Sequence, residues 1–477
     1  MSLWIEYAYR HPVRVSFLVA IIARGLAIIL GSIIVDGVLI PDEMQYIELA
    51  AAASDGRLSE NFWPGYGQEF FASTRTFMLP LTGLFWLFGP WRIVGQVFSA
   101  VIGALVAAVT TATAGNVVRR PFDLLAGLIV ALLPSQVLFS SAVLRESLIW
   151  LLLATLAWII GFTHNEYFTH RLVLQFLAAG LVFVALADVR EQTAILALWS
   201  LASALMYRHY RRPLRVIGVV ALLLVAPTLA GMGIGGEEYI GASLHRLGSA
   251  YTYQAINADT GFLGLQGGVV SEGSGGVVSE GSGGVVSEGC DSREINGNTM
   301  SLDVRSFSWK LLERDTSTTI CIRDWNGNSI VVDNSVGSNL KRLPRGLINT
   351  LVRPYPWEFR AISSLSVSDG SSVAGTVSWA KLFAGLESFV WVVLYLLALV
   401  GVWGSRGKFA EMMFPIFIIV SISLSGAIVH GNLGTAFRHR GQFLFALAIL
   451  ASGGVQVIGD RQKDTQGAGS GGCSLPS

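Results

Sequence analysis

The chain has only three cysteines among its 477 residues, at positions 290, 321 and 473. Three thiols are too few for a disulfide framework or a cysteine-rich zinc site, so both are excluded as the basis of the fold. Cys290 and Cys321 share one polar segment that we expect to be exported. A disulfide between them stays open, because such a compartment is oxidising.

Charged residues are also few, at 14% of the chain, and they sum to a formal net charge of +1. This excludes a nucleic-acid partner, because no basic stripe is present to neutralise phosphates. Hydrophobic residues make up 52% and occur in blocks of about 17–25 residues, the length that crosses a bilayer. The sequence therefore predicts an all-α polytopic membrane protein embedded in the lipid bilayer.

We expect about ten transmembrane helices. The candidate spans are residues 14–35, 92–114, 123–141, 143–161, 172–187, 191–207, 214–232, 380–402, 409–428 and 441–458. The first has no small-residue cleavage site and is expected to remain as an anchor. The apolar piece 76–90 is short and contains Pro80 and Pro90. We place it in the membrane interface, with an eleventh span as the alternative.

Lys and Arg in the short loops predict the orientation. If the piece 76–90 does not cross, these residues fall on one side, which we assign to the cytoplasm together with both termini. They are Arg10, Arg14, Arg119, Arg120, Arg171, Arg208, Arg211, Arg212, Arg215, Arg406, Lys408, Arg461 and Lys463.

The opposite, outer face then collects charges from five distant parts of the chain. They are Asp42 with Glu43, Arg145 with Glu146, Asp188 with Arg190, Arg353, and the run Arg438, His439 and Arg440. Each group alone fits a snorkelling or salt-bridged interfacial position. Ionisable groups at inward-facing span ends usually mark a site. We therefore predict that Asp42, Arg145, Asp188 or Arg190, and Arg438 to Arg440 line one cavity open to the outer face.

The chemistry of this set is limited. Paired carboxylates can take a proton from a hydroxyl group or hold a divalent cation, and Asp42 with Glu43 are the candidate ligands for Mg²⁺ or Mn²⁺. Arg and His clusters bind phosphate. Together they favour transfer of a group from a lipid-linked phosphate.

Three segments of the first 230 residues resemble the GT-C glycosyltransferases, in particular the lipid A aminoarabinose transferases and protein mannosyltransferases. The segments are PDEMQYIELAAA, FMLPLTGLFWLFGPWRIVGQVFSA and LLPSQVLFSSAVLRESLIWLLL. In the family the hinge of the third segment more often carries Asp, where this chain has Arg145 and Glu146. Beyond residue 232, RPYPWE and GNLGTAFRHR are more loosely similar to proteins of bacterial polysaccharide loci.

The resemblance implies an inverting glycosyltransferase of the bacterial cytoplasmic (inner) membrane. Its donor would be a polyprenyl-phosphate-linked sugar, and its acceptor a lipid, glycan or protein in cell-envelope assembly. By position, Asp42 would be the catalytic base and Glu43 would bind a metal or orient the acceptor hydroxyl. The leaving phosphate would be bound by Arg438, His439 and Arg440 first, then by Arg353 and Arg145. The residues expected to contact the acceptor or otherwise line the site are Tyr46, Glu146, Asp188 and Arg190.

The chain organisation follows from these features. We expect a catalytic transmembrane module at 1–232 with an outer loop at 36–91, a small β-rich or irregular extracytoplasmic insertion at 233–379, C-terminal transmembrane helices at 380–458, and a disordered cytoplasmic tail at 459–477. Within the insertion, SIVVDN alternates like a strand. Three near-identical GGVVSEGS octads at 267–274, 275–282 and 283–290 favour a flexible excursion.

Two other functions stay open. An O-antigen-type polymerase or ligase also carries outer Arg and His and a large outer loop, but it usually lacks an acidic pair after the first span. A lipid-linked glycan transporter would show inverted repeats and charged or broken spans at the midplane. We find no such repeat in the sequence, and mid-span charges are scarce.

Overall fold

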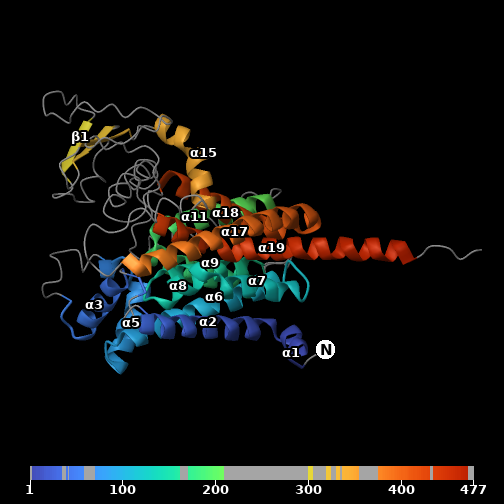
Figure 1. Ribbon diagram of the computed structural model, residues 1–477, viewed down its shortest axis with the longest axis horizontal. Helices are drawn as coiled ribbons and strands as arrows, with labels where there is room; N and C mark the ends of the chain where they lie inside the picture. Colours follow the sequence, from blue (N-terminus) through green and yellow to red (C-terminus); the bar gives the residue numbers. More distant parts are fainter. Residues whose placement is uncertain are drawn as a thin grey trace, which may run out of the picture. The chain divides into compact units, whose positions relative to one another are not determined.

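The computed structural model describes residues 3–34, 39–40, 42–58, 70–161, 170–208, 299–303, 319–323, 329–333, 336–353, 374–429 and 433–470. These residues are mainly helical (Figure 1). The chain divides into two compact units, one of residues 1–234, 356–421 and 441–477, the other of residues 235–355 and 422–440. The first boundary between the two units, after residue 234, lies close to the predicted boundary at 232. The second unit also includes residues 422–440.

Among the described residues, five helices are long and apolar enough to cross a membrane. They are Pro12–Ile34, Arg92–Ala114, Leu386–Gly404, Arg406–Ala427 and Phe437–Lys463. The helices α7 (Phe122–Leu132) and α8 (Pro134–Ser141) make a sixth if this pair, bent by 57°, counts as one span. The chain is thus a helical membrane protein. The count of ten stays a prediction, and the candidate span 214–232 lies outside the described residues.

The first unit contains most of the helices. In chain order they are α1 (Leu3–Arg10), α2 (Pro12–Ile34), α3 (Glu43–Ser54), α5 (Arg75–Phe88), α6 (Arg92–Ala114), α7, α8, α9 (Glu146–Gly161), α10 (His170–Val189), α11 (Glu191–Arg208), α17 (Ala374–Gly404), the 3-10 turn η2 (Arg406–Lys408), the first part of α18 (Phe409–Val429) and most of α19 (Leu433–Ser470).

The centre of the first unit is a close packing of α2, α6, α7 and α9. Small residues permit it, as in other membrane helix pairs. A Cβ atom added at Gly127 of α7 would lie 1.8 Å from Thr111 Oγ1 of α6, and Thr111 in turn donates a hydrogen bond of 2.8 Å to Ser16 of α2.

Polar contacts join the loops at one end of this packing. Arg120 Nη1 donates to the Tyr9 carbonyl at 3.2 Å, Lys408 Nζ donates to the Val117 carbonyl at 2.9 Å, and Arg119 pairs with Asp460. We call this the Arg119 end; α1 lies there, at the right of Figure 1. The basic loop residues near 10, 119 and 408 therefore share one end of the helices, as the charge pattern requires.

The helix α5 lies at the opposite end, with α3, at the left of Figure 1. Its start is held by Asp188, which accepts from the Thr76 backbone N–H at 2.6 Å, and just beyond its end Arg92 pairs with Glu43. Fourteen residues make a helix of about 21 Å, which is short for the hydrocarbon layer. Both ends of α5 thus join residues of the same end, and the interfacial placement of the piece 76–90 stays a prediction.

The second unit contains a three-stranded sheet in the order β1-β2-β3, formed by β1 (Thr299–Asp303), β2 (Thr319–Arg323) and β3 (Ser329–Asp333). The pair β1–β2 is parallel with Thr299 opposite Thr319, and β2–β3 is antiparallel with Thr319 opposite Asp333. The strand β3 covers the SIVVDN segment. Cys321 lies on β2, whereas Cys290 and the GGVVSEGS octads lie outside the described residues, so the disulfide stays a prediction.

The second unit also includes α15 (Val336–Val352), the end of α18 and the start of α19. A Cβ atom at Gly346 of α15 would lie 2.0 Å from the Ala427 carbonyl of α18, so glycine is needed for this approach.

One expectation about the C-terminus differs from the structure. Residues 459–470, which the composition predicts to be disordered, continue α19 as helix to Ser470. The physical reason is that the helix propagates from the apolar span, at little cost per added residue, and the pair between Asp460 and Arg119 ties its first polar turn.

Candidate functional site

The first turn of α3 brings Glu43 into the interior. Its side chain is 0% exposed, Oε2 accepts from the Val143 backbone N–H at 3.3 Å, and Oε1 lies 3.9 Å from Arg92 Nε. Burial raises the pKa of Glu43 above its usual range, because the charged form loses hydration. The hydrogen bonds from Val143, Leu39 and Gln96 and the charge of Arg92 oppose this shift.

Asp42, the predicted base, lies at the N-cap position of α3 and is half-buried. Its backbone is helical, with φ −64° and ψ −21°, and its side chain makes no capping hydrogen bond. A capping side chain normally accepts from the second or third N–H of the helix with an extended backbone. Asp42 therefore does not cap α3 through its side chain. Pro41 lies outside the described residues.

The hinge between α8 and α9 carries the next pair. Arg145 Nη1 donates to the Val189 carbonyl at 3.1 Å. Glu146 is 3% exposed, and its Oε1 lies 3.8 Å from Arg190 Nη1. The contacts of Arg145 and Glu146 thus connect the hinge after α8 to the junction of α10 and α11. The Val143 N–H connects the same hinge to Glu43. We call Asp42, Glu43, Arg92, Arg145, Glu146, Asp188 and Arg190 the Glu43 cluster.

Asp188 has a structural role within the Glu43 cluster. It accepts from Thr76 Oγ1 at 2.7 Å as well as from the Thr76 N–H, and Arg75 Nε lies 3.5 Å from its other oxygen. The carboxylate thus caps α5 from another helix, since Thr74 at the N-cap makes no side-chain cap bond. A negative charge at this position also suits the helix dipole.

Tyr46 also has a packing role. Its ring contacts Phe70 edge-on at 5.2 Å between centroids and Phe77 at 5.6 Å, and it is buried. These contacts position α3 against α5. The assignment of Tyr46 to the acceptor side stays a prediction.

Charge pairing in the Glu43 cluster distinguishes Arg145 from its neighbours. Glu43 pairs with Arg92, Glu146 with Arg190, and Asp188 with Arg75. Arg145 has no ion-pair partner among the described residues, and its guanidinium lies 5.9 Å from the centre of the Phe70 ring. Among the described residues, its half-buried charge faces a carbonyl oxygen and an aromatic ring, which suits binding of an anion.

The predicted phosphate ligands Arg353 and Arg440 contact each other in the second unit. Arg440 is 0% exposed, donates from Nη2 to the Arg353 carbonyl, and lies 4.6 Å from the Phe437 ring centre. Its side chain is therefore part of the packing of this unit. Arg438 and His439 are half-buried. A cavity shared with the Glu43 cluster stays a prediction.

A divalent cation does not fit the surroundings of Glu43. The Glu43 carboxylate already faces the Arg92 guanidinium and the Val143 N–H, and a guanidinium at this distance would repel a metal ion. In the part of the chain that the structure describes, no three His, Cys, Asp or Glu residues gather as a metal site.

The sequence reasoning missed two buried charges that lie within candidate spans. Arg24 lies near the middle of α2 and is 0% exposed, and Glu387 of α17 is 3% exposed. Both contact the break between α7 and α8. An arginine at the centre of a 23-residue apolar helix was the available signal, because such a charge needs buried partners.

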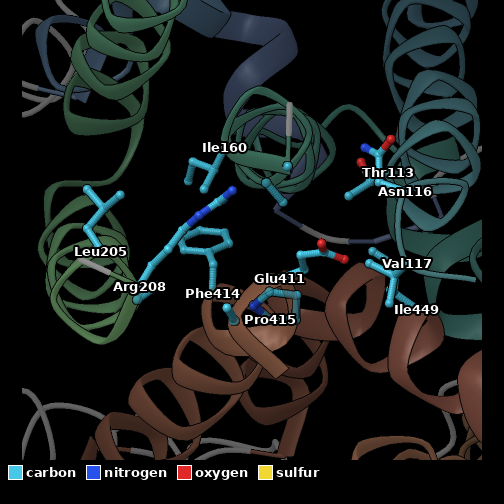
Figure 2. A pocket seen from close by; sticks show the side chains of 14 residues that line it. Thr113, Asn116, Val117, Ile160, Leu205, Arg208, Glu411, Phe414, Pro415 and Ile449 are labelled. Atoms are coloured by element: carbon cyan, nitrogen blue, oxygen red, sulfur yellow. The ribbon is translucent and has the colours of Figure 1, made fainter. Parts of the chain in front are cut away.

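A small cavity lies at the Arg119 end (Figure 2). Its volume is about 30 Å³, and its polar lining comes from Thr113, Asn116, Arg208 and Glu411. Arg208 extends from α11 and Glu411 from α18. A cavity of this size has room for one or two water molecules and is too small for a sugar or a lipid phosphate.

The arrangement in the first unit supplies a half-buried carboxylate (Asp42), a buried carboxylate paired with arginine (Glu43), and an arginine with no carboxylate partner among the described residues (Arg145).

No protein-family model, no curated protein and no solved structure matches this chain significantly.

Proposed function

We propose that this protein is a membrane glycosyltransferase that moves a sugar from a polyprenyl-phosphate donor to an extracytoplasmic acceptor. The observation that carries the proposal is the charge pairing in the Glu43 cluster. Three carboxylates there are paired with arginine, while Arg145 has no ion-pair partner among the described residues. The resemblance of the first 230 residues to GT-C enzymes supports the same function.

In the proposed reaction, Asp42 accepts the proton of the acceptor hydroxyl. The hydroxyl oxygen then forms a bond to the anomeric carbon of the sugar on the face opposite the phosphate. The bond between that carbon and the phosphate oxygen breaks, its electron pair leaves with the polyprenyl phosphate, and the configuration inverts. Arg145 stabilises the departing phosphate, since fixed positive charge is most effective where negative charge develops.

Glu43 positions the site rather than exchanging protons with substrate. Its carboxylate is fully buried and holds the hinge after α8 through the Val143 N–H. It also orients Arg92. Because the Arg92 guanidinium faces the Glu43 carboxylate, we propose that Glu43 acts without a bound metal ion, and excess EDTA in the transfer assay tests this.

We also propose that the Glu43 cluster faces outward from a bacterial cytoplasmic membrane in a chain of ten spans. The support is that Arg120 donates to the Tyr9 carbonyl and Lys408 to the Val117 carbonyl, so these basic loops share the Arg119 end, and positive loops indicate the cytoplasm. Polyprenyl-phosphate sugars presented outside the cytoplasm would then meet Asp42 and Arg145.

The test is transfer by the purified protein in detergent, with a polyprenyl-phosphate sugar as donor and extracted envelope glycolipid as acceptor. Asp42→Asn keeps the shape of the side chain and loses the base, so the rate should fall by about two to four orders of magnitude. The control is Asp55→Asn, because Asp55 lies at the other end of α3 and is exposed beside Arg57. Its rate should match that of the wild type.

Normal turnover in Asp42→Asn would remove the base assignment and leave Glu43 as the next candidate. If Asp42→Asn and Glu43→Gln both keep full activity, the transferase proposal is wrong. Mass spectrometry of envelope glycolipids from a strain without this chain should independently show a missing sugar.

A second candidate function is transport of a lipid-linked glycan. The break between α7 and α8, with Arg24 and Glu387 beside it, is the kind of charged, interrupted span that transporters use. Release of free polyprenyl phosphate during turnover distinguishes the two functions, because a transporter leaves the sugar–phosphate bond intact.

A further inference from the structure

The break between α7 and α8 leaves helix-end polar groups in the middle of an apolar helix pair that is bent by 57°. Pro134 causes it, because proline lacks an N–H and pushes the preceding residue out of the helical region. Leu133 accordingly has φ −61° and ψ 124°. The last carbonyls of α7 and the first N–H groups of α8 therefore need other partners.

Two buried charges of opposite sign supply these partners. Arg24 Nη1 donates to the Ala131 carbonyl in the last turn of α7 at 3.2 Å. Glu387 accepts from the Ser135 backbone N–H at 2.7 Å and from Ser135 Oγ at 2.5 Å, and Trp391 Nε1 donates to it at 2.9 Å. The signs match the helix dipoles, since a helix is negative at its C-terminus and positive at its N-terminus.

Arg24 also holds the far end of α8. Its Nε donates to Ser140 Oγ at 2.6 Å, and Ser141 Oγ donates to the Arg24 carbonyl at 3.3 Å. A Cβ atom at Gly103 of α6 would lie 2.6 Å from Arg24 Nε and 2.5 Å from Ser140 Cβ. Glycine at this position therefore leaves space for the contact between Arg24 and α8.

The helix α8 links these buried charges to the Glu43 cluster. It has eight residues, a length of about 12 Å. Val143, which donates its N–H to Glu43, follows two residues after α8, and Arg145 follows four residues after it. Any tilt of α8 would thus move the backbone that contacts Glu43.

We propose that Arg24 and Glu387 are positioning residues that clamp α8, and that this clamp sets the place of the hinge 142–145 against Glu43. The catalytic consequence rests on the proposed transferase function, whereas the placement of the hinge does not. Loss of either charge should leave helix-end groups without a partner in a dry interior, where such groups are costly, and α8 should shift to find others.

The experiment measures access to the hinge directly. The three native cysteines are replaced by Ser, and Val143→Cys introduces a thiol at a fully buried position of the hinge. A second reporter, Ala154→Cys, places a thiol at a fully buried position of α9 and reports global unfolding. Labelling by a maleimide is followed for the purified protein in detergent.

We expect Arg24→Met and Glu387→Gln each to raise the labelling rate at position 143 by about tenfold or more, while position 154 stays protected. A tenfold change corresponds to about 1.4 kcal/mol in the equilibrium for opening. The control Arg14→Met removes an exposed arginine of the same helix and should change neither rate.

Unchanged protection at position 143 in both clamp variants overturns the proposal. If Arg24→Met exposes both reporters, this variant is unfolded and does not test the proposal. The test then uses Glu387→Gln and Gly103→Ala. The Gly103→Ala change displaces Arg24 without removing a charge. Protection at position 143 in these two variants also overturns it.

The activity assay separates this inference from the proposed function. If clamp variants expose position 143 while the wild type transfers no sugar, the transferase proposal fails and the clamp stands. If the wild type transfers sugar and position 143 stays protected in every variant, the clamp alone fails. With both correct, Glu387→Gln should lower kcat more than it raises KM, because Arg145 of the hinge is assigned to the charge that develops as the phosphate departs.

Discussion

Single residues in the Glu43 cluster divide into those that hold the structure and those available for chemistry. Glu43, Glu146 and Asp188 are buried and paired with arginine or helix N–H groups. Such pairs are costly to break, since removal of one partner leaves an uncompensated charge. Asp42 and Arg145 are half-buried, and they are the residues to which we assign proton and phosphate chemistry.

The raised pKa of Glu43 makes a prediction about pH. Because burial favours the protonated form, the stability it contributes is full below the unfolded pKa of about 4.3 and is lost as pH rises through the folded pKa. The melting temperature of the wild type should therefore fall more steeply above about pH 5 than that of Glu43→Gln.

Thermal unfolding in detergent, followed from pH 4.5 to pH 8, measures this difference. Glu48→Gln is the matched control, since Glu48 is an exposed residue of the same helix, and it should follow the wild type. Parallel curves for Glu43→Gln and the wild type would contradict the buried-carboxylate interpretation.

The arginines of the second unit make a separate prediction. Arg438 is half-buried, so Arg438→Ala should weaken binding of polyprenyl phosphate, and Arg438→Lys should restore it only in part, because lysine lacks the planar fork. Arg440 is fully buried against Phe437, so Arg440→Lys should mainly lower the melting temperature. Binding is measured by titration of the purified variants. Equal affinity for wild type, Ala and Lys at position 438 would assign that residue to interfacial anchoring.

At the scale of elements, close helix packing depends on a few glycines. A Cβ atom at Gly401 of α17 would lie 2.1 Å from the Leu450 carbonyl of α19, and one at Gly454 of α19 would lie 2.0 Å from the Leu397 carbonyl of α17. Backbone atoms cannot move aside as a flexible side chain can. These two glycines therefore set the distance between α17 and α19.

We predict that Gly454→Val lowers stability by about 1–3 kcal/mol, the usual cost of overpacking. Gly25→Val of α2 is the control, because nothing lies within 4 Å of its added Cβ, and it should change stability little. Chemical denaturation of both variants in detergent gives the comparison. A stable Gly454→Val would show that the two helices separate at low cost.

At the scale of the whole molecule, the charge pattern predicts opposite sides for the two ends of the first unit. In a chain with its native cysteines replaced by Ser, Ser73→Cys lies near α5 and Gly407→Cys lies in η2, and both native residues are exposed. An impermeant maleimide should label position 73 in intact cells and position 407 only after the membrane is opened. Labelling of both positions in intact cells would reject the topology.

The sequence by itself determined the protein class and the ranges of several helices. The predicted span 92–114 has the bounds of α6, and the predicted spans 191–207 and 409–428 differ by one residue from α11 and α18. The reason is that apolar length is a local property of the chain. Loop charge similarly indicated which residues gather at the Arg119 end.

Only the tertiary structure decided which charges pair and which are buried. Arg24 meets Ser140 across 116 residues of chain, and Glu387 meets Ser135 across 252. The sequence had suggested that mid-span charges are scarce. It also indicated residues of the Glu43 cluster, but not which of them form ion pairs. Pairing and burial depend on contacts between segments far apart in the chain, and no local pattern specifies which carboxylate faces which arginine.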